Sequence, residues 1–275
     1  MDKFSVLMPV YAKENPEFFN KAIGSIVNQT LKPEQIVIVK DGPLTLNLDN
    51  VINSYIQKYG ELFTVVSLEK NVGQGFARNA GIKACRNNYI ALMDSDDIAL
   101  PNRFEVQLKY LLENPEIDCI GSYITEFDDD EARPTCKKVV PINHEEIFKF
   151  GKWRSPLCNM TVVFKKDKIE SVGLYNGFSF GEDWYLFAKM LMAGMKFYNI
   201  PEVLVNVRGG SSMLAKRIGL NRIKQETNLF ILFYKMGYIN LYECVRNIVL
   251  KFLLRIIPTF LRKFIYDNFL RDKRI

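Results

Sequence analysis

The chain has 275 residues, of which 48% are hydrophobic and 25% charged, and its formal net charge is +6. This length is enough to bury a full core, and no internal repeat or low-complexity linker is visible, which favours two subdomains sharing one sheet over two independent units. No apolar run approaches the length that spans a membrane, because Lys251 and Arg255 interrupt the C-terminal one. We therefore expect a chain that does not cross a membrane.

The five cysteines, at positions 85, 119, 136, 158 and 244, are odd in number and show no Cys-x-x-Cys spacing. We expect them to be reduced thiols of a cytosolic protein. The N-terminus enters a strand almost at once, so we also expect no signal peptide and a cytoplasmic location.

Strand-like and helix-like segments alternate through the first third of the chain. Strands are expected at residues 4–11, 35–39, 63–68 and 89–93, and helices at 18–29, 48–59 and 75–85. This alternation predicts a parallel sheet with right-handed crossovers, whose ligands bind beyond the carboxyl ends of the strands. Tyr11, Asp41, Asn71 and Asp94 each lie just past a strand end, so they should converge on one crevice.

The last of these strands runs straight into a carboxylate cluster that contains Asp94, Asp96 and Asp97. Asp94 and Asp96 have one residue between them, so they point to the same side and are able to share one divalent cation. Mg²⁺ and Mn²⁺ take oxygen ligands and keep positions open for phosphate oxygens, which indicates a metal-diphosphate site. The alternative is that Asp96 and Asp97 only cap a helix that begins near Pro101, and the cluster alone does not decide between the two.

Two common nucleotide-binding motifs are missing from the sequence. The turn at residues 10–15 has no glycine, and Arg78 stands where the third glycine of a dinucleotide fingerprint belongs after Gly73 and Gly75. No Gly-Lys-Ser/Thr occurs either. A P-loop is therefore excluded, and a nicotinamide-dependent oxidoreductase is disfavoured.

Five motifs together resemble those of family 2 glycosyltransferases, in the same order and spacing over residues 3–210. They are Met-Pro-Val-Tyr at 8–11, the strand ending in Lys-Asp-Gly at 40–42, Asn-Val-Gly-Gln-Gly-Phe-Ala-Arg-Asn-Ala-Gly-Ile at 71–82, Met-Asp-Ser-Asp-Asp at 93–97 followed by Pro-Asn-Arg at 101–103, and Gly-Glu-Asp-Trp at 181–184. Lys-Glu-Asn-Pro at 13–16 and Lys-Asp-Gly-Pro-Leu-Thr at 40–45 look most like the bacterial amylovoran, O-antigen and capsule biosynthesis branch.

The resemblance implies an α/β protein of the GT-A fold. A Rossmann-like nucleotide-sugar-binding half at residues 1–105 and an acceptor half at 106–212 would share one mixed sheet, followed by a basic amphipathic helical tail at 213–275. It also implies a nucleoside-diphosphate sugar, usually UDP-linked, as the donor.

The matching positions carry implied roles at the donor site. Asp41 would accept the uracil N3 hydrogen, Tyr11 would lie against the base, and Arg78 would approach the nucleotide or its diphosphate, unless it is a solvated helix residue. Asp94 would hold the ribose or a metal-bound water, and Asp96 would bind Mn²⁺ or Mg²⁺ with Asp94. Three further residues complete the implied nucleotide-sugar site: Pro9, Asn71 and Ser95.

The resemblance also names a base for the acceptor. Asp183, before a helix expected at 184–193, would accept the proton of the acceptor hydroxyl, whereas a plain N-cap is the alternative. Direct in-line attack would invert the anomeric centre. Cys158-Asn159 stands where relatives often carry Asn-His, so no acceptor role is assigned there. The acidic run at 128–131 is interpreted as a solvated turn and His144 as a cap or surface residue.

The positive charge is concentrated in the tail, where residues 216–275 hold 13 Lys+Arg against 4 Asp+Glu. Glu243, Asn247, Lys251 and Arg255 fall four apart and form one polar stripe on an otherwise apolar helix. This pattern suits an anionic membrane surface better than nucleic acid, which we do not expect as a partner. The alternatives are a helical cap docked on the catalytic domain or a homodimer contact.

Together these observations predict an inverting, metal-dependent glycosyltransferase at the inner face of a bacterial plasma membrane. It would move a hexose from a UDP-sugar, with galactose or glucose favoured, to a lipid-diphosphate-linked saccharide in surface polysaccharide biosynthesis. A dTDP-rhamnose-using enzyme is the nearest alternative, and a non-catalytic nucleotide-sugar-binding module is the alternative of another class. A nucleotidyltransferase is disfavoured because the first strand is not followed by a glycine- and arginine-rich loop.

Overall fold

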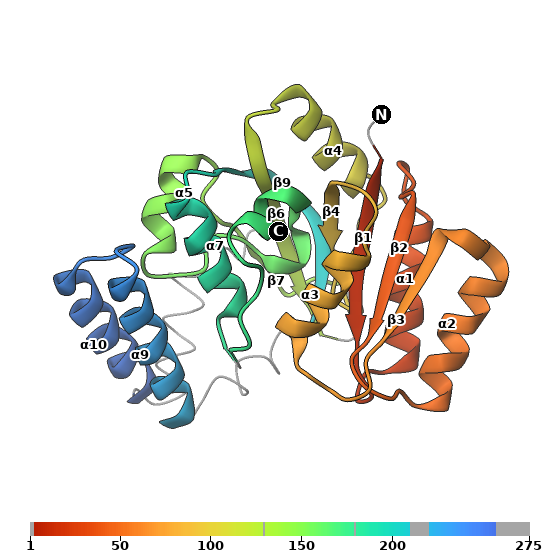
Figure 1. The fold of residues 1–275 in the computed structure, drawn as a ribbon, viewed down its shortest axis with the longest axis horizontal. Helices are drawn as coiled ribbons and strands as arrows, with labels where there is room; N and C mark the ends of the chain where they lie inside the picture. The colour runs from red at the N-terminus through yellow and green to blue at the C-terminus, as the bar shows by residue number, and fades with distance from the viewer. Residues whose placement is uncertain (1–2, 129, 179, 210–219, 257–275) are drawn as a thin grey trace.

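The first part of the chain forms four strands separated by three helices, as predicted. The computed structural model describes residues 3–128, 130–178, 180–209 and 220–256 (Figure 1). The strands are β1 (Phe4–Val10), β2 (Gln35–Lys40), β3 (Phe63–Ser67) and β4 (Tyr89–Leu92), and the helices are α1 (Pro16–Val27), α2 (Leu46–Tyr59) and α3 (Gln74–Ala84). The α1 helix begins where the Asn15 side chain accepts the backbone N–H of Glu17 and a proline follows, and both features favour a helix start.

The rest of the described chain adds strands of mixed direction and helices around them. The strands are β5 (Ile98–Ala99), β6 (Ile117–Phe127), β7 (Cys136–Lys138), β8 (Val163–Lys165) and β9 (Lys196–Arg208). The helices are α4 (Arg103–Glu113), α5 (His144–Gly151), α6 (Lys166–Ser171), α7 (Glu182–Met192), α9 (Leu220–Lys235) and α10 (Leu241–Ile256), with short 3-10 turns η1 (Gly60–Leu62) and η2 (Asn159–Thr161).

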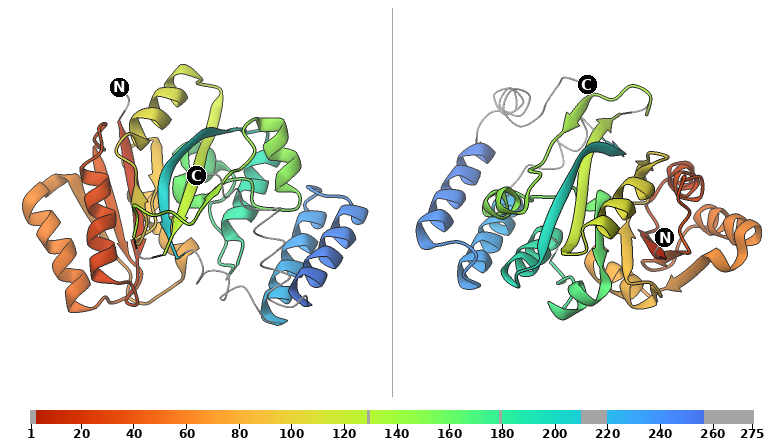
Figure 2. Two further views of the ribbon diagram at one scale, coloured as in Figure 1. Left: turned by 180° about the vertical axis from the view of Figure 1, so that it is seen from behind. Right: turned by 90° about the horizontal axis from the view of Figure 1, so that it is seen from above.

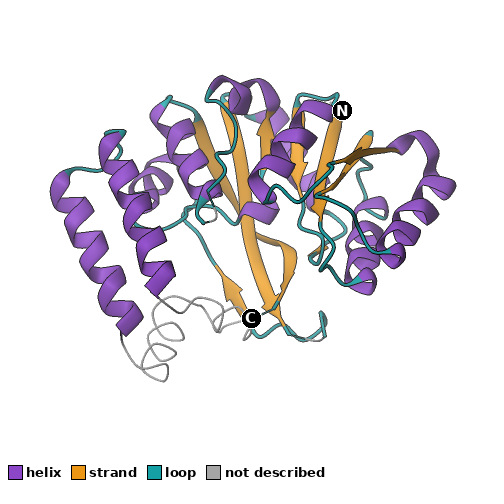
Figure 3. Cartoon of the chain, turned by 60° about the horizontal axis from the view of Figure 1, so that its bottom comes forward, coloured by secondary structure: helices purple, strands orange, loops and turns teal. Residues whose placement is uncertain are grey.

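The nine strands of the described residues form one mixed sheet, in which eight follow the order β3-β2-β1-β4-β8-β6-β9-β5 and β7 pairs with β6. Strands β3, β2, β1 and β4 are parallel. Strand β8 is antiparallel to β4 and β6, and β9 runs parallel to β6. Figure 3 shows this sheet with helices packed around it. The four parallel strands and the later strands of mixed direction thus share one sheet, which confirms the predicted fold class.

Alternate side chains of β1 enter two separate cores. Val6 and Met8 pack with Ile23 of α1 on one face, whereas Leu7 packs with Ile82 of α3 on the other. Helices therefore cover both faces of the parallel part of the sheet (Figure 2). A sheet buried on both faces gives the side chains at its strand ends a fixed position.

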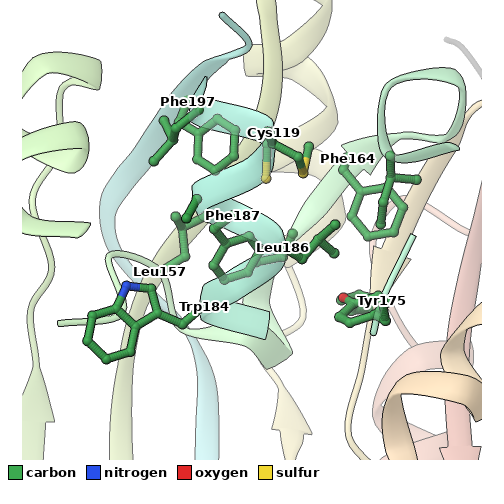
Figure 4. Packing of buried hydrophobic residues seen from close by; sticks show 14 of the residues in the cluster. Cys119, Leu157, Phe164, Tyr175, Trp184, Leu186, Phe187 and Phe197 are labelled. Atoms are coloured by element: carbon green, nitrogen blue, oxygen red, sulfur yellow. The ribbon is translucent and has the colours of Figure 1, made fainter. Parts of the chain in front are cut away.

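Helix α7 is held against the second half of the sheet by large aromatic side chains (Figure 4). Phe187 meets Phe197 of β9 with their ring centroids 6.2 Å apart. The buried Trp184 indole N–H donates to the carbonyl oxygen of Gly151 at 2.6 Å, which satisfies its one polar group. The first turn of α7, which contains Asp183, is therefore positioned by a rigid core.

The helical tail docks on the rest of the protein through α7 and the end of α5 (Figure 1). Phe230 and Phe233 of α9 pack edge-on against Trp184, with centroid distances of 5.6 and 5.2 Å. The Lys152 ammonium lies 3.1 Å from Glu243 Oε1, and the Lys152 carbonyl accepts a hydrogen bond from Asn247 at 2.8 Å. Two members of the predicted polar stripe thus face the body of the protein, as the docked-cap alternative requires.

The opposite side of α10 is apolar and exposed. Its exposed side chains are Leu241, Tyr242, Val245, Val249, Leu250, Phe252 and Leu253. In the described part of the chain, no helix is both long enough and apolar enough to cross a membrane. The predicted boundary at residue 212 lies outside the described residues, and the division into two halves and a tail stays a prediction.

Candidate active site

The carboxyl ends of β1, β2 and β4 open into one cavity of about 400 Å³. Its lining includes six of the predicted donor-site residues together with Asp96, namely Pro9, Tyr11, Asp41, Asn71, Asp94 and Ser95. Because parallel strands end at the same edge of a sheet, residues distant in sequence meet there. The predicted convergence on one crevice is confirmed, whereas the role of each residue stays a prediction.

Asp41 connects the end of β2 to the loop that precedes α3. Its two carboxylate oxygens accept the backbone N–H groups of Val72 at 2.7 Å and Gly73 at 3.2 Å. The Asn71 side-chain amide donates to the Asp41 carbonyl at 3.2 Å. At Gly42, which has a φ of 85°, a Cβ would lie 2.7 Å from the Asn71 backbone nitrogen, so the close approach requires glycine. The Asp41 carboxylate keeps acceptor capacity beyond these two bonds.

Carboxylates crowd the wall of this cavity beyond β4. Burial, reinforced by the charges of Asp94 and Glu14, raises the pKa of Asp96 to about 7. Glu14 is itself positioned by Ser95, whose hydroxyl donates to Glu14 Oε2 at 2.6 Å. The three acids line one cavity, so their negative charges act on the same space.

The capping alternative for Asp96 and Asp97 is wrong. Helix α4 begins only at Arg103, after Asn102 as N-cap. Asp97 Oδ1 instead accepts the backbone N–H of Arg208 at 2.9 Å. Burial, followed by the charge of Asp96, raises the pKa of Asp97 well above its usual range. Asp97 therefore anchors the end of β9, whereas Asp96 lines the cavity.

Arg78 is buried rather than solvated, so the solvated alternative is also wrong. Its Nη2 lies 3.0 Å from Asp94 Oδ1 and its Nη1 lies 3.4 Å from Glu182 Oε1. Burial lowers the pKa of Arg78, but electrostatic interactions with Asp94, Tyr175 and Glu182 outweigh this effect, and the pKa is raised. Arg78 thus connects the end of β4 to the start of α7.

A second cavity of about 830 Å³ adjoins the first and shares Asn71, Gly73, Gln74 and Asp94 with it. Asp183 lines this larger cavity as the second residue of α7. The N-cap is Gly181, with a φ of 70°, so the N-cap alternative for Asp183 is wrong. The Asp183 side chain makes no hydrogen bond to another described residue. Asp183 is therefore positioned on the wall of this cavity.

The neighbouring Glu182 is engaged differently. Its carboxylate contacts Arg78 and accepts the backbone N–H of Gly75 at the start of α3. Burial raises its pKa to about 7, with Arg78 opposing and Asp183 adding to the rise. A Cβ on Gly75 would lie 2.6 Å from Glu182 Oε2, so the glycine makes room for this contact.

The sequence interpretation missed Glu14, Glu182 and Asn159 as wall residues of the two cavities. With its amide oxygen turned toward Arg78, Asn159 accepts from Nη1 at 3.2 Å and from Nη2 at 2.8 Å. Glu14 and Glu182 stand within motifs that carried the family resemblance, which is a signal that could have found them. Asn159 stood at a position where relatives often carry Asn-His, but its contact with Arg78 could not be predicted, because the two residues are distant in sequence.

The remaining expectations concern residues away from the cavities. All five cysteines are buried and free, as expected. His144 is the first residue of α5, and its Nδ1 accepts the backbone N–H of Phe197 at 3.3 Å. In the acidic run, Asp130 is exposed and pairs with Arg133, whereas Asp129 lies outside the described residues.

Comparison with known proteins shows the family. Residues 5–173 match the model of glycosyl transferase family 2. The amylovoran biosynthesis glycosyltransferase AmsE of Erwinia amylovora is 36% identical over 96% of this chain and 98% of its own length. The UDP-Gal:alpha-D-GlcNAc-diphosphoundecaprenol beta-1,3-galactosyltransferase of Escherichia coli is 35% identical over 98% of this chain and 97% of its own length.

Solved structures agree in fold. S. aureus TarS 1-349 in complex with UDP-GlcNAc gives a TM-score of 0.64 at 17% identity, over 92% of this chain and 72% of that one. The mannosyltransferase PcManGT of Pyrobaculum calidifontis, in complex with GDP-Man and Mn²⁺, gives a TM-score of 0.64 at 15% identity, over 85% of this chain and 64% of that one. The chain therefore belongs to glycosyltransferase family 2 and is a transferase of the GT-A fold.

Proposed function

We propose that this enzyme is an inverting, metal-dependent glycosyltransferase that moves a hexose from a UDP-sugar to a lipid-diphosphate-linked saccharide in surface polysaccharide biosynthesis. The observation that carries the proposal is the junction of two cavities at Asp94, with the predicted nucleotide residues in one and Asp183 in the other. The name of the Escherichia coli relative supports UDP-galactose as the first donor and a diphosphate lipid as the acceptor carrier. UDP-glucose is the second candidate.

The smaller cavity suits the nucleotide. Tyr11 is 44% exposed, so its ring is accessible to a flat base, and the Asp41 carboxylate lies on the same wall to accept the uracil N3 hydrogen. Arg78 contributes indirectly, because its two ion pairs hold Asp94 and Glu182 in place.

The acids of this cavity fit a divalent cation such as Mn²⁺ or Mg²⁺. Asp94 and Asp96 offer oxygen ligands on one wall. The pKa of Asp96 is raised first by burial and then by the charges of Asp94 and Glu14, and a cation would offset this crowding of negative charge. Within the described residues, no group of three His, Cys, Asp or Glu side chains is arranged to hold an ion alone. Mg²⁺ is commonly bound by one or two protein carboxylates together with phosphate oxygens of the substrate. When bound, the ion stabilises the negative charge of the departing diphosphate.

Asp183 is the base in this proposal. Its carboxylate accepts the proton of the acceptor hydroxyl while that oxygen forms its bond to the anomeric carbon. The bond from this carbon to the UDP oxygen breaks on the opposite face, and UDP leaves with the electron pair. One displacement of this kind inverts the anomeric centre. Glu182 is less suited to the role, because its carboxylate is engaged with Arg78 and the Gly75 N–H.

The enzyme would work as a peripheral protein at the inner face of the plasma membrane. The exposed apolar side of α10 supports this, since it combines with a basic tail whose partner would be an anionic bilayer. A lipid-linked acceptor is presented at such a surface. A homodimer contact through the same side of α10 is the alternative.

The full-length protein should be screened against a panel of nucleotide sugars, with GlcNAc-diphosphoundecyl as acceptor and release of UDP or dTDP as the readout. We expect UDP release with UDP-galactose or UDP-glucose that depends on both Mn²⁺ and acceptor. If only dTDP is released, from dTDP-rhamnose, then dTDP-rhamnose rather than a UDP-sugar is the donor. Binding of UDP-sugars without turnover of any donor would instead identify a non-catalytic binding module.

A further inference from the structure

Cationic side chains from the second half of the sheet and from the tail helices line the larger cavity, in addition to Arg78 of α3. Arg154 comes from the loop after α5, Arg222 from α9 and Lys251 from α10. Asp94 and Arg78, in contrast, belong to the nucleotide half and pair with each other. The two tail helices thus bring two positive charges, from Arg222 and Lys251, and one negative charge, from Glu226, to the lining that includes Asp183.

Lys251 is placed in the cavity by the docking of α10. Glu243, Asn247 and Lys251 lie four residues apart, so they share one face of the helix. The first two bind Lys152, which orients this face toward the protein. The Lys251 ammonium lies 6.0 Å from the ring centroid of Trp184, the residue that follows Asp183. A member of the stripe expected on the membrane surface is therefore a wall residue of the cavity.

Arg222 is oriented by the aromatic ring of Phe180, which lies just before α7. Its guanidinium carbon lies 3.3 Å from the centroid of Phe180, just before the N-cap of α7. Glu226 lies one turn further along α9, with 3.7 Å between its Oε1 and Arg222 Nε. The planar guanidinium is therefore held in a defined place, which suits recognition of phosphate oxygens.

A groove of about 500 Å³ adjoins the larger cavity and shares Gly177, Phe178 and Phe180 with it. It is further lined by three apolar side chains of α9, Leu229, Ile231 and Leu232, and by three polar ones, Gln225, Asn228 and Lys235. Asp183 and the three cationic residues line the same cavity, and the groove adjoins it. A saccharide on a lipid diphosphate carries a hydroxyl, a diphosphate and a hydrocarbon chain, and these walls offer a carboxylate, cations and apolar side chains to match them.

We propose that Lys251, Arg222 and Arg154 bind the diphosphate of the acceptor, so that the α9–α10 hairpin, together with the loop after α5, selects a lipid-diphosphate acceptor. This inference rests on the proposed function, because it assigns the acceptor of the same site. In the proposed function the donor diphosphate binds elsewhere, next to Asp94 and Asp96, which both line the smaller cavity. The hairpin is then a substrate-recognition element as well as a docked cap.

Binding of decyl diphosphate to the full-length protein tests the inference, measured by calorimetry with UDP and Mn²⁺ at saturation so that the donor site is filled. The wild type should bind decyl diphosphate more tightly than the neutral decyl maltoside. Lys251→Gln and Arg154→Gln should each weaken decyl diphosphate binding about tenfold, the size of one charge-assisted hydrogen bond. Their affinity for UDP should stay within about twofold of the wild type.

Lys224→Gln is the matched control, because Lys224 is an exposed lysine of α9 outside the walls of the cavity and the groove. It should bind decyl diphosphate as the wild type does. Unchanged binding in both Lys251→Gln and Arg154→Gln, or loss of UDP affinity in parallel, would overturn the inference. The proposed function is tested separately, by hexose transfer. If the wild type transfers hexose but both variants bind decyl diphosphate with full affinity, only the proposed diphosphate site is contradicted. If the variants show the expected loss of decyl diphosphate binding but the wild type transfers no hexose, only the proposed function is contradicted.

Discussion

Arg78 Nη2 lies 3.0 Å from Asp94 Oδ1, and the Arg78 side chain is only 3% exposed. This ion pair stands where the two cavities meet, since Asp94 lines both. It links α3 to the end of β4, which precedes the acidic cluster. Through Glu182, the same arginine also reaches the helix that carries Asp183.

Replacing Arg78 by Met should destabilise the protein by about 3 kcal/mol, because it leaves the carboxylates of Asp94 and Glu182 without their buried partner. Urea unfolding monitored by circular dichroism measures the change. Lys83→Met is the control, since Lys83 is exposed on the same helix and should cost no more than about 0.5 kcal/mol. Equal stability of the two variants would contradict the structural role of Arg78.

Replacing Asp96 by Asn should leave the fold intact. It should raise the activation free energy of transfer by roughly 2 to 4 kcal/mol, because stabilisation of the leaving group is lost. The steady-state rate of UDP release at saturating Mn²⁺ measures this. Excess EDTA should abolish the activity of the wild type. Near-normal turnover of Asp96→Asn, or full activity in EDTA, would refute the metal assignment.

The pKa of Glu182 makes stability depend on pH in a defined direction. The unfolded glutamate ionises near its ordinary pKa of 4.5, whereas the folded one keeps its proton up to about 7. Because the folded state binds more protons in this window, this group lowers stability as pH rises from about 4.5 to 7, by roughly 1 to 3 kcal/mol. Glu182→Gln should lack this decrease. Urea unfolding of both proteins at several pH values checks it, and parallel pH profiles would contradict it.

The exposed apolar side of α10 should bind anionic vesicles. We expect the full-length protein to sediment with phosphatidylglycerol vesicles at low salt and less at high salt, because the basic tail contributes about 1 kcal/mol per Lys or Arg near the surface. Leu250→Glu combined with Leu253→Glu should weaken sedimentation strongly. Leu46→Glu is the control, since Leu46 is an exposed apolar residue of α2, at the far end of the molecule from α10 (Figure 1). Full sedimentation of the double variant would favour a dimer contact through this side.

Local sequence patterns were sufficient to predict the parallel part of the sheet. The four parallel strands follow from their apolar runs, and Tyr11, Asp41 and Asp94 meet because each follows a strand of the same sheet. The periodicity of apolar residues predicts strands and helices, because secondary structure of this kind depends on neighbours along the chain.

Long-range contacts were not predictable in the same way. The burial of Arg78 depends on Glu182, more than a hundred residues away, which no helix pattern reports. The polar stripe of α10 was visible in the sequence, but which surface it faces depends on Lys152 at the end of α5. The positions that sequence reasoning missed are therefore those defined by contacts between distant elements.

The central claim, that Asp183 is the base, is tested most directly by single-turnover transfer from UDP-galactose in Asp183→Asn. Asparagine keeps the shape of the side chain but accepts no proton, so transfer should fall by roughly 10² to 10⁴ while the affinity for UDP-galactose is unchanged. Asp167→Asn is the matched control, because Asp167 is an exposed second residue of α6 and should retain full activity. Transfer by Asp183→Asn at the wild-type rate, with binding preserved, would contradict the account.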